Sequence, residues 1–148
     1  MKISYAITVC NEFDEIRRLI DNLSQMKRDE DEIVVLFDKG GGTAKVWSYL
    51  QFCLSEYKNI KIEAQTFKNH FADWKNELFK LCTGDYIFQI DADEMPSEIL
   101  IDNLPTILET NDVDVIMVPR INTVEGLTNE HINRWKWSII LGRYEYNL

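Results

Sequence analysis

The fold of this chain is decided by residues 84–94, which read Gly84-Asp85-Tyr86-Ile87-Phe88-Gln89-Ile90-Asp91-Ala92-Asp93-Glu94. The first half is a short apolar segment typical of a β-strand, and the second half holds three carboxylates within four residues. In an extended segment, residues two apart point to the same side. We therefore expect Asp91 and Asp93 to aim in one direction, with their Cα atoms about 7 Å apart.

Two carboxylates this close repel each other unless a positive charge lies between them. A hard divalent cation, Mg²⁺ or Mn²⁺, favours oxygen ligands and can bind phosphate oxygens in its remaining positions. The alternative is a solvated acidic turn, which is common after a strand. The strand directly before the cluster favours the metal site, because ligands of open α/β sheets bind at the carboxyl ends of strands. The sequence thus predicts a site for Mg²⁺ or Mn²⁺ held by Asp91 and Asp93.

The composition is that of a folded globular protein, with 148 residues, 45% hydrophobic and 28% charged. This length fits one domain, so we expect residues 1–148 to form a single domain. A net charge of −9 argues against nonspecific nucleic-acid binding, so no nucleic-acid partner is expected. No apolar run approaches the ~20 residues that span a bilayer. The amino terminus has no signal-peptide pattern, so a cytoplasmic location is the expectation.

Strand and helix patterns alternate along most of the chain. Apolar segments typical of strands are residues 3–9, 33–37, 60–66, 86–90 and 113–118. Between them, helical spacing appears in residues 13–26, 46–57, 71–81 and 99–108, with a break expected at Pro105. In the third of these helices, an apolar face is marked by Phe71, Trp74, Leu78 and Leu81. The alternation predicts a Rossmann-like α/β fold, with a parallel-rich sheet and helices on both faces.

Polar side chains follow three of the predicted strands, in Thr8–Glu12, at Asp38 and in Asp91–Glu94. In a parallel sheet the carboxyl ends of the strands lie on one edge, so these groups can converge. Each alone has a simpler explanation: Asn11 offers a helix cap, and Asp38 before three glycines is typical of a turn. Together they predict a cleft with one end for a base and ribose and another for a metal and diphosphate.

Other nucleotide-binding and hydrolytic motifs do not occur in the sequence. The glycine-rich segment Gly40–Lys45 lacks the spacing of a phosphate-binding P-loop, so it predicts a flexible loop. No G-x-G-x-x-G follows the first strand, which argues against a dinucleotide-binding unit. No G-x-S-x-G is present, which argues against an esterase-type serine.

Four segments, in this order, resemble the nucleotide-binding part of a family 2 glycosyltransferase with the GT-A fold. They are Ile7-Thr8-Val9-Cys10-Asn11-Glu12, Val35-Leu36-Phe37-Asp38, Lys75-Asn76 followed by Thr83-Gly84-Asp85-Tyr86-Ile87, and the Asp-x-Asp (DXD) motif Asp91-Ala92-Asp93-Glu94. The resemblance implies an enzyme that moves a sugar from a UDP- or GDP-sugar donor, with inversion and with Mn²⁺ or Mg²⁺. The acceptor it implies is a hydroxyl of a glycan or a lipid-linked molecule.

The resemblance also implies which residues bind the donor. Six side chains would contact it: Thr8, Asn11, Glu12, Asp38, Lys75 and Asp91. Within this set Asp38 would contact the base, and Lys75 would offset the donor's negative charge. Asp91 would face the ribose or the metal, and Asp93 would hold the metal that bridges the diphosphate.

The chain departs from the family pattern in two places. The second strand leads into Lys39–Gly42 where the family usually has Asp-Gly-Ser. Residues 121–148 are expected to be only the beginning of the acceptor region, and no general base is identified in them. The alternative is therefore a shortened, catalytically silent nucleotide-sugar-binding module, which a partner or a second copy of the chain would complete. A third interpretation, a sugar nucleotidyltransferase, requires a glycine-rich loop with an arginine after the first strand, and Cys10–Glu12 is not such a loop.

Overall fold

The computed structural model describes residues 1–122, 126, 128–135, 137–140 and 143–146. The chain divides into two compact units, Met1–Asp112 and Val113–Leu148, which are described separately below. The expectation of one functional domain over residues 1–148 stays a prediction.

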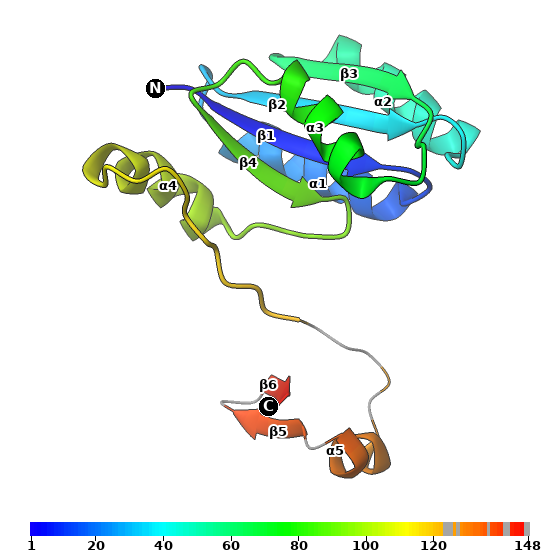
Figure 1. Cartoon of the computed structure of the whole chain (residues 1–148), viewed down its shortest axis with the longest axis vertical. Helices are drawn as coiled ribbons and strands as arrows, with labels where there is room; N and C mark the ends of the chain where they lie inside the picture. Colours follow the sequence, from blue (N-terminus) through cyan, green and yellow to red (C-terminus); the bar gives the residue numbers. More distant parts are fainter. Residues whose placement is uncertain (123–125, 127, 136, 141–142, 147–148) are drawn as a thin grey trace. The chain divides into compact units, whose positions relative to one another are not determined.

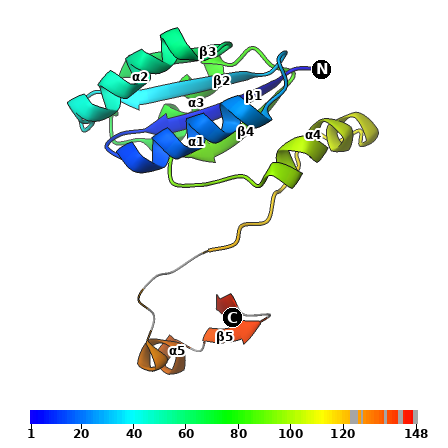
Figure 2. The ribbon, with the colours of Figure 1, turned by 180° about the vertical axis from the view of Figure 1, so that it is seen from behind.

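The first unit is a four-stranded parallel sheet covered by helices. Its strands are β1 (Ile3–Val9), β2 (Glu32–Asp38), β3 (Ile60–Gln65) and β4 (Tyr86–Asp91), in the spatial order β3-β2-β1-β4. Its helices are α1 (Phe13–Met26), α2 (Ala44–Glu56), α3 (Phe71–Leu81) and α4 (Glu98–Thr110). Helices α1 and α2 cover one face of the sheet and α3 covers the other (Figures 1 and 2). The prediction of a parallel α/β sheet with helices on both faces is confirmed.

Burial explains why β1 and β2 occupy the centre of the sheet. A strand with covered faces and neighbours on both sides needs apolar residues almost continuously, and both sequences supply them. Tyr5, Ile7 and Val35, for example, are fully buried. The edge strand β4 alternates between more and less exposed residues, with Ile87 exposed.

The core between the sheet and α3 fixes which strand residues face that helix. It is formed by Ala6, Val34, Leu36, Trp74 and Leu78. Because alternate residues of a strand share a face, Thr8 continues the row of Ala6, and Asp38 continues the row of Leu36. The register between β1 and β4 places Asp91 beside Thr8. The strand ends therefore carry Thr8, Asp38 and Asp91 on the α3 side of the sheet.

The opposite edge of the sheet, at the amino ends of the strands, is joined by one buried carboxylate. Glu32 accepts hydrogen bonds from Lys2 Nζ at 2.7 Å, Ser4 Oγ at 2.6 Å and the Thr83 backbone N–H at 2.6 Å. Burial alone would raise the pKa of Glu32, but these hydrogen bonds outweigh it and lower the pKa from 4.5 to about 2. This carboxylate links β1, β2 and the α3–β4 connection.

The second unit contains α5 (Asn129–Trp135) and an antiparallel pair of short strands, β5 (Trp137–Ile140) and β6 (Arg143–Tyr146). Within the described residues of either unit, no helix combines the length and the apolar character that crossing a bilayer requires. The cytoplasmic location stays a prediction.

Two predictions about the later part of the chain were wrong. Residues 113–118 were predicted as a strand, but they form none, and Val115 and Met117 are 78% and 92% exposed. In the part of the chain that the structure describes, no strand pairs with this segment, and an extended segment without a partner leaves its backbone groups to solvent. Pro105 was expected to break a helix, but it lies inside the continuous helix α4, where it removes a single backbone donor.

Candidate functional site

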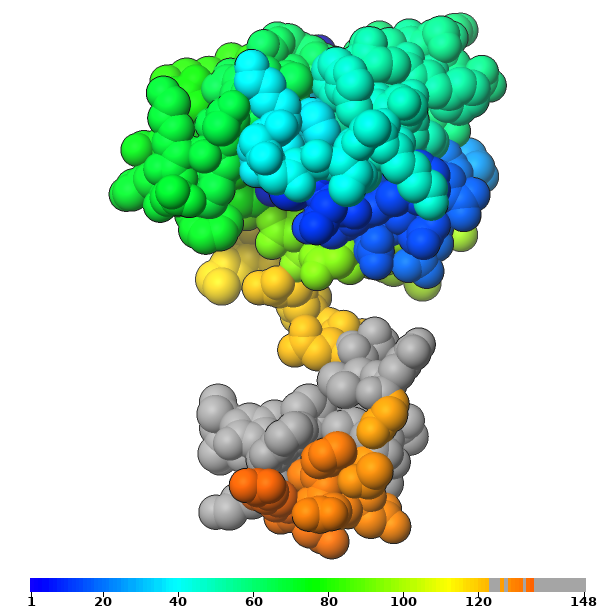
Figure 3. Space-filling model, turned by 90° about the vertical axis from the view of Figure 1, so that its right-hand side faces the viewer, coloured from blue at the N-terminus to red at the C-terminus, as the bar shows by residue number. Residues whose placement is uncertain are grey.

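The carboxyl edge of the sheet gathers segments that are far apart in the sequence. The loops after β1, β2 and β4 and the β3–α3 connection all lie on the side seen in Figure 3, as dark-blue, cyan, yellow-green and green atoms. Asp38 is the last residue of β2 and Asp91 is the last residue of β4, and β1 with Thr8 lies between these strands. The structure thus brings together the three strand ends that the sequence singled out.

Lys75 of α3 links two of these strand ends. Its ammonium donates a hydrogen bond to Thr8 Oγ1 at 2.9 Å and forms an ion pair with Asp91 Oδ1 at 2.6 Å. The Lys75 side chain is only 18% exposed, whereas the Asp91 side chain is 48% exposed. An ammonium group paired with a carboxylate is therefore held, largely out of solvent, at the carboxyl edge of β1 and β4.

Asp38 is fixed by the backbone of the loops around it. Its Oδ1 accepts hydrogen bonds from the Gly40 N–H at 2.9 Å and the Phe67 N–H at 3.0 Å. Burial alone would raise the pKa of Asp38, but the bonds from Phe67, Gly40 and Gly41 outweigh it and lower the pKa. Asp38 is thus an ionised hydrogen-bond acceptor with a fixed orientation.

Cys10 lies beside Asp38 and was not identified from the sequence as a site residue. Its Sγ is 3.7 Å from Asp38 Oδ2. Burial raises the pKa of the Cys10 thiol, and the negative charges of Asp38 and Glu12 raise it further, so the group stays protonated and can donate to Asp38. The signal available in the sequence was its position directly after β1, which is shared with many structural cysteines.

Glu12 closes the loop after β1 on itself. Its Oε2 accepts hydrogen bonds from the backbone N–H groups of Cys10 at 2.8 Å and Asn11 at 3.0 Å. The helix-cap explanation for Asn11 is wrong, because the N-cap of α1 is Glu12, whose side chain makes no capping hydrogen bond. Asn11 is exposed at the carboxyl edge, and its contact with a donor stays a prediction.

The acidic cluster is a turn and not an extended segment. Strand β4 ends at Asp91, and the backbone turns so that the Glu94 N–H donates to the Asp91 carbonyl at 2.9 Å. The Glu94 carboxylate also accepts from the Asp91 N–H at 2.9 Å. The predicted extended arrangement was therefore wrong, because Glu94 binds back onto the strand end. Ala92 is buried in this turn and Asp93 is exposed.

Two carboxylates of this turn, Asp91 and Asp93, are the groups that would hold the predicted cation. Among the described residues, no three His, Cys, Asp or Glu side chains converge to hold a metal ion. Mg²⁺ usually binds one or two carboxylates and completes its shell with water and substrate phosphates, so it does not require such a cluster. Asp91 and Asp93 supply this number of carboxylates, and one oxygen of Asp91 is occupied by Lys75. The metal site stays a prediction.

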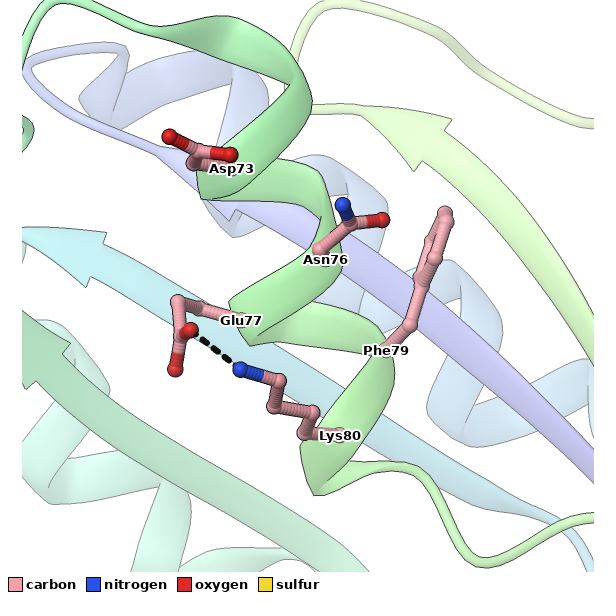
Figure 4. Close-up of a pocket in the computed structure, with 5 residues that line it drawn as sticks. All are labelled: Asp73, Asn76, Glu77, Phe79 and Lys80. Atoms are coloured by element: carbon pink, nitrogen blue, oxygen red, sulfur yellow. Dashed lines mark hydrogen bonds and ion pairs between the residues drawn. The ribbon is translucent and has the colours of Figure 1, made fainter.

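A shallow hollow on the outer face of α3 is separate from this edge. It is lined by Asp73, Asn76, Glu77, Phe79 and Lys80 (Figure 4). The Glu77–Lys80 ion pair crosses the hollow at 2.6 Å between exposed side chains. Since none of the strand-end residues lines it, we do not assign the hollow to the candidate site.

Similarity to known proteins agrees with this architecture. The SPbeta prophage-derived glycosyltransferase SunS of Bacillus subtilis (strain 168) and the glycosyltransferase SunS of Bacillus phage SPbeta are each 25% identical over 117 residues, or 77% of this chain. The chain spans about a quarter of the length of these relatives, since the match covers 26% of each.

The chain is also similar to solved structures and matches the sequence model of a protein family. Two crystal structures of S. aureus TarS 1–349, one alone and one in complex with UDP, match this chain with a TM-score of 0.66 and 18% sequence identity. Each match covers 81% of this chain, and it covers 39% of the TarS chain alone and 38% of the TarS chain with UDP. This likeness confirms the predicted GT-A-like fold. The sequence model of Glycosyl transferase family 2 matches residues 4–148. The chain therefore belongs to glycosyl transferase family 2.

Proposed function

We propose that the carboxyl edge of the sheet binds the nucleoside diphosphate of a sugar donor, and that the protein transfers the sugar to an acceptor hydroxyl. The donor is a UDP- or GDP-sugar, the cation is Mn²⁺ or Mg²⁺, the acceptor is a glycan or a lipid-linked molecule, and the reaction inverts the anomeric centre. The observation that carries this proposal is the Lys75 ammonium held between Thr8 and Asp91. In a chain of net charge −9, a shielded cation at the ligand-binding edge of a parallel sheet suits an anionic ligand.

Each strand end has a separate part in this proposal. Asp38, ionised and fixed by backbone amides, accepts a hydrogen bond from an N–H group of the base. Lys75 offsets the negative charge of the donor beside Thr8. Asp91 faces the ribose or the metal, and Asp93 holds the metal. When bound, the cation stabilises the negative charge that develops on the leaving diphosphate.

Glu12 and Asn11, the other two residues proposed to bind the donor, lie in the loop after β1. Glu12 keeps this loop closed through its bonds to the backbone of Cys10 and Asn11, which leaves the Asn11 side chain exposed at the edge. An arrangement of this kind holds polar groups in place before the donor arrives, so less conformational entropy is lost on binding.

A second candidate is a module that binds the donor without transferring the sugar. Transfer requires a general base that takes the proton of the acceptor hydroxyl. The carboxylates of Glu12 and Glu94 both accept bonds from backbone N–H groups, which ties them to the loops that they close. Measured turnover decides between the candidates: sugar transfer or slow donor hydrolysis by the purified chain would exclude the silent module.

Isothermal titration with UDP, GDP and their sugar conjugates, with Mn²⁺ or with EDTA, tests the proposal. We expect binding that depends on the metal and is lost in Asp93→Ala. Asp102→Ala, which removes an exposed carboxylate from α4, serves as the matched control and should bind as the unchanged protein does. Absence of metal-dependent binding, or full binding by Asp93→Ala, would refute the proposal.

A further inference from the structure

Phe71, the first residue of α3, is exposed although the sequence pattern places it on the buried face of that helix. Trp74 and Leu78 of the same face are 8% and 0% exposed, whereas Phe71 is 73% exposed. Phe71 opens α3 directly after the β3–α3 connection, whereas Trp74 and Leu78 lie in the later turns, which pack on the sheet. The ring of Phe71 thus leaves most of its apolar surface in water, where a ligand could cover it.

The ring of Phe71 is supported on one side. Its centroid lies 4.9 Å from that of Phe67, and Phe67 in turn packs edge-on against Trp74 at 5.7 Å. The Phe67 backbone N–H donates to Asp38 Oδ1, which ties this aromatic group to the end of β2. The ring of Phe71 is therefore backed by a fixed neighbour while most of its surface stays open.

Phe71 also lies next to the charged group of the candidate site. Residues four apart are neighbours on one helix face, so Phe71 and Lys75 lie on one side of α3. Side chains of a helix lean toward its amino end, and the amino end of α3 lies at the carboxyl edge. Lys75 reaches Thr8 and Asp91. Phe71 lies one turn closer to the amino end of α3, and its ring contacts that of Phe67, whose backbone N–H donates to Asp38.

We propose that Phe71 is the stacking surface for the base of the nucleoside diphosphate, and that it contributes to the choice of base. A nucleobase has a polar edge and a flat apolar face. Asp38 offers an acceptor for N–H groups on the edge, and Phe71 offers a supported ring for the face. This inference rests on the proposed function, because it assumes that a nucleotide binds at this edge.

The test compares a ligand that has a base with one that lacks it. We would titrate UDP and inorganic pyrophosphate, each with Mn²⁺, into the unchanged chain and the variants Phe71→Ala and Phe71→Trp. Stacking of a base on an aromatic side chain, measured by alanine substitution, predicts that Phe71→Ala weakens UDP binding by about 5- to 150-fold. Pyrophosphate binding should not change, and Phe71→Trp should retain UDP binding. The loss of ultraviolet absorbance that accompanies base stacking should disappear in Phe71→Ala.

Phe52→Ala, which removes a 52% exposed ring from α2, is the matched control and should leave both affinities unchanged. If the unchanged chain binds neither ligand, the proposed function fails and the inference fails with it. If the unchanged chain binds UDP and Phe71→Ala binds it equally well, only the inference is overturned. It is also overturned if Phe71→Ala weakens the binding of UDP and of pyrophosphate equally, since the ring would then serve folding. The same holds if Phe71→Ala changes only the sedimentation of the chain, since the ring would then serve contact between copies.

Discussion

Replacing Glu32 with Gln should make the protein less stable at neutral pH, and this loss of stability should be much smaller in acid. In the folded chain the Glu32 carboxylate has a pKa of about 2 instead of 4.5, because Lys2, Ser4 and Thr83 bond to its ionised form. Each pKa unit corresponds to about 1.4 kcal/mol. With the cost of burial included, ionised Glu32 therefore contributes about 3 kcal/mol more to the free energy of unfolding at pH 7 than its protonated form would. The side chain is only 11% exposed, so solvent screens this contribution weakly.

The direction of the pH dependence follows from the lowered pKa. A group with a depressed pKa in the folded state contributes its full stability above the pKa of the unfolded state, here 4.5, and loses it as the pH falls toward 2. Urea denaturation of the unchanged protein and of Glu32→Gln at several pH values measures this. We expect a difference of about 3 kcal/mol at pH 7 that shrinks to roughly half at pH 3.

The matched control is Glu77→Gln, which removes the carboxylate of an ion pair whose side chains are 41% and 68% exposed. Exposed pairs of this kind are worth little, so its free energy of unfolding should change by less than about 0.5 kcal/mol. A Glu32→Gln variant that loses the same stability at pH 3 as at pH 7, or that loses none at pH 7, would refute the assignment of Glu32 as the link between β1, β2 and the α3–β4 connection.

Three further predictions concern the carboxyl edge. Lys75→Met should weaken UDP binding in titration calorimetry by about 10- to 150-fold, the range for a hydrogen bond to a charged group. The melting temperature of Lys75→Met should change little, because Asp91, the partner of Lys75, is half-exposed. A large fall in melting temperature with unchanged UDP affinity would contradict a role of Lys75 in donor binding. Gly41→Ala should destabilise the chain by roughly 1 kcal/mol in urea, because a Cβ atom there would lie 2.9 Å from Cys10 Sγ and 3.1 Å from Asp38 Oδ2; an unchanged midpoint would contradict it. Removal of divalent cations with EDTA should abolish UDP binding, and binding restored by Mn²⁺ in the same titration would confirm the requirement.

The central part of the fold was predictable because its signals are local. The uninterrupted apolar runs of β1 and β2 require cover on both faces, and the alternation with helices requires parallel connections. Parallel strands end on one edge, so the convergence of Thr8, Asp38 and Asp91 also followed from the order of the elements.

Other features depend on contacts that a local pattern does not record. The acidic cluster forms a turn in which the Glu94 carboxylate accepts a hydrogen bond from the Asp91 N–H. The sequence alone is equally compatible with an extended strand end. Phe71 has helical spacing with Trp74, but it is the first residue of α3 and is 73% exposed, so the spacing does not lead to burial. Residues 113–118 have a strand pattern, and a strand also requires a neighbour to pair with.

The position of the nucleotide is tested most directly by a crystal structure of the chain soaked with UDP and Mn²⁺. We predict the diphosphate beside Lys75, the ion in contact with Asp93, and the base between Asp38 and Phe71. A nucleotide bound elsewhere, such as in the hollow on the outer face of α3, or an ion that contacts neither Asp91 nor Asp93, would contradict the assignment of the carboxyl edge as the donor site.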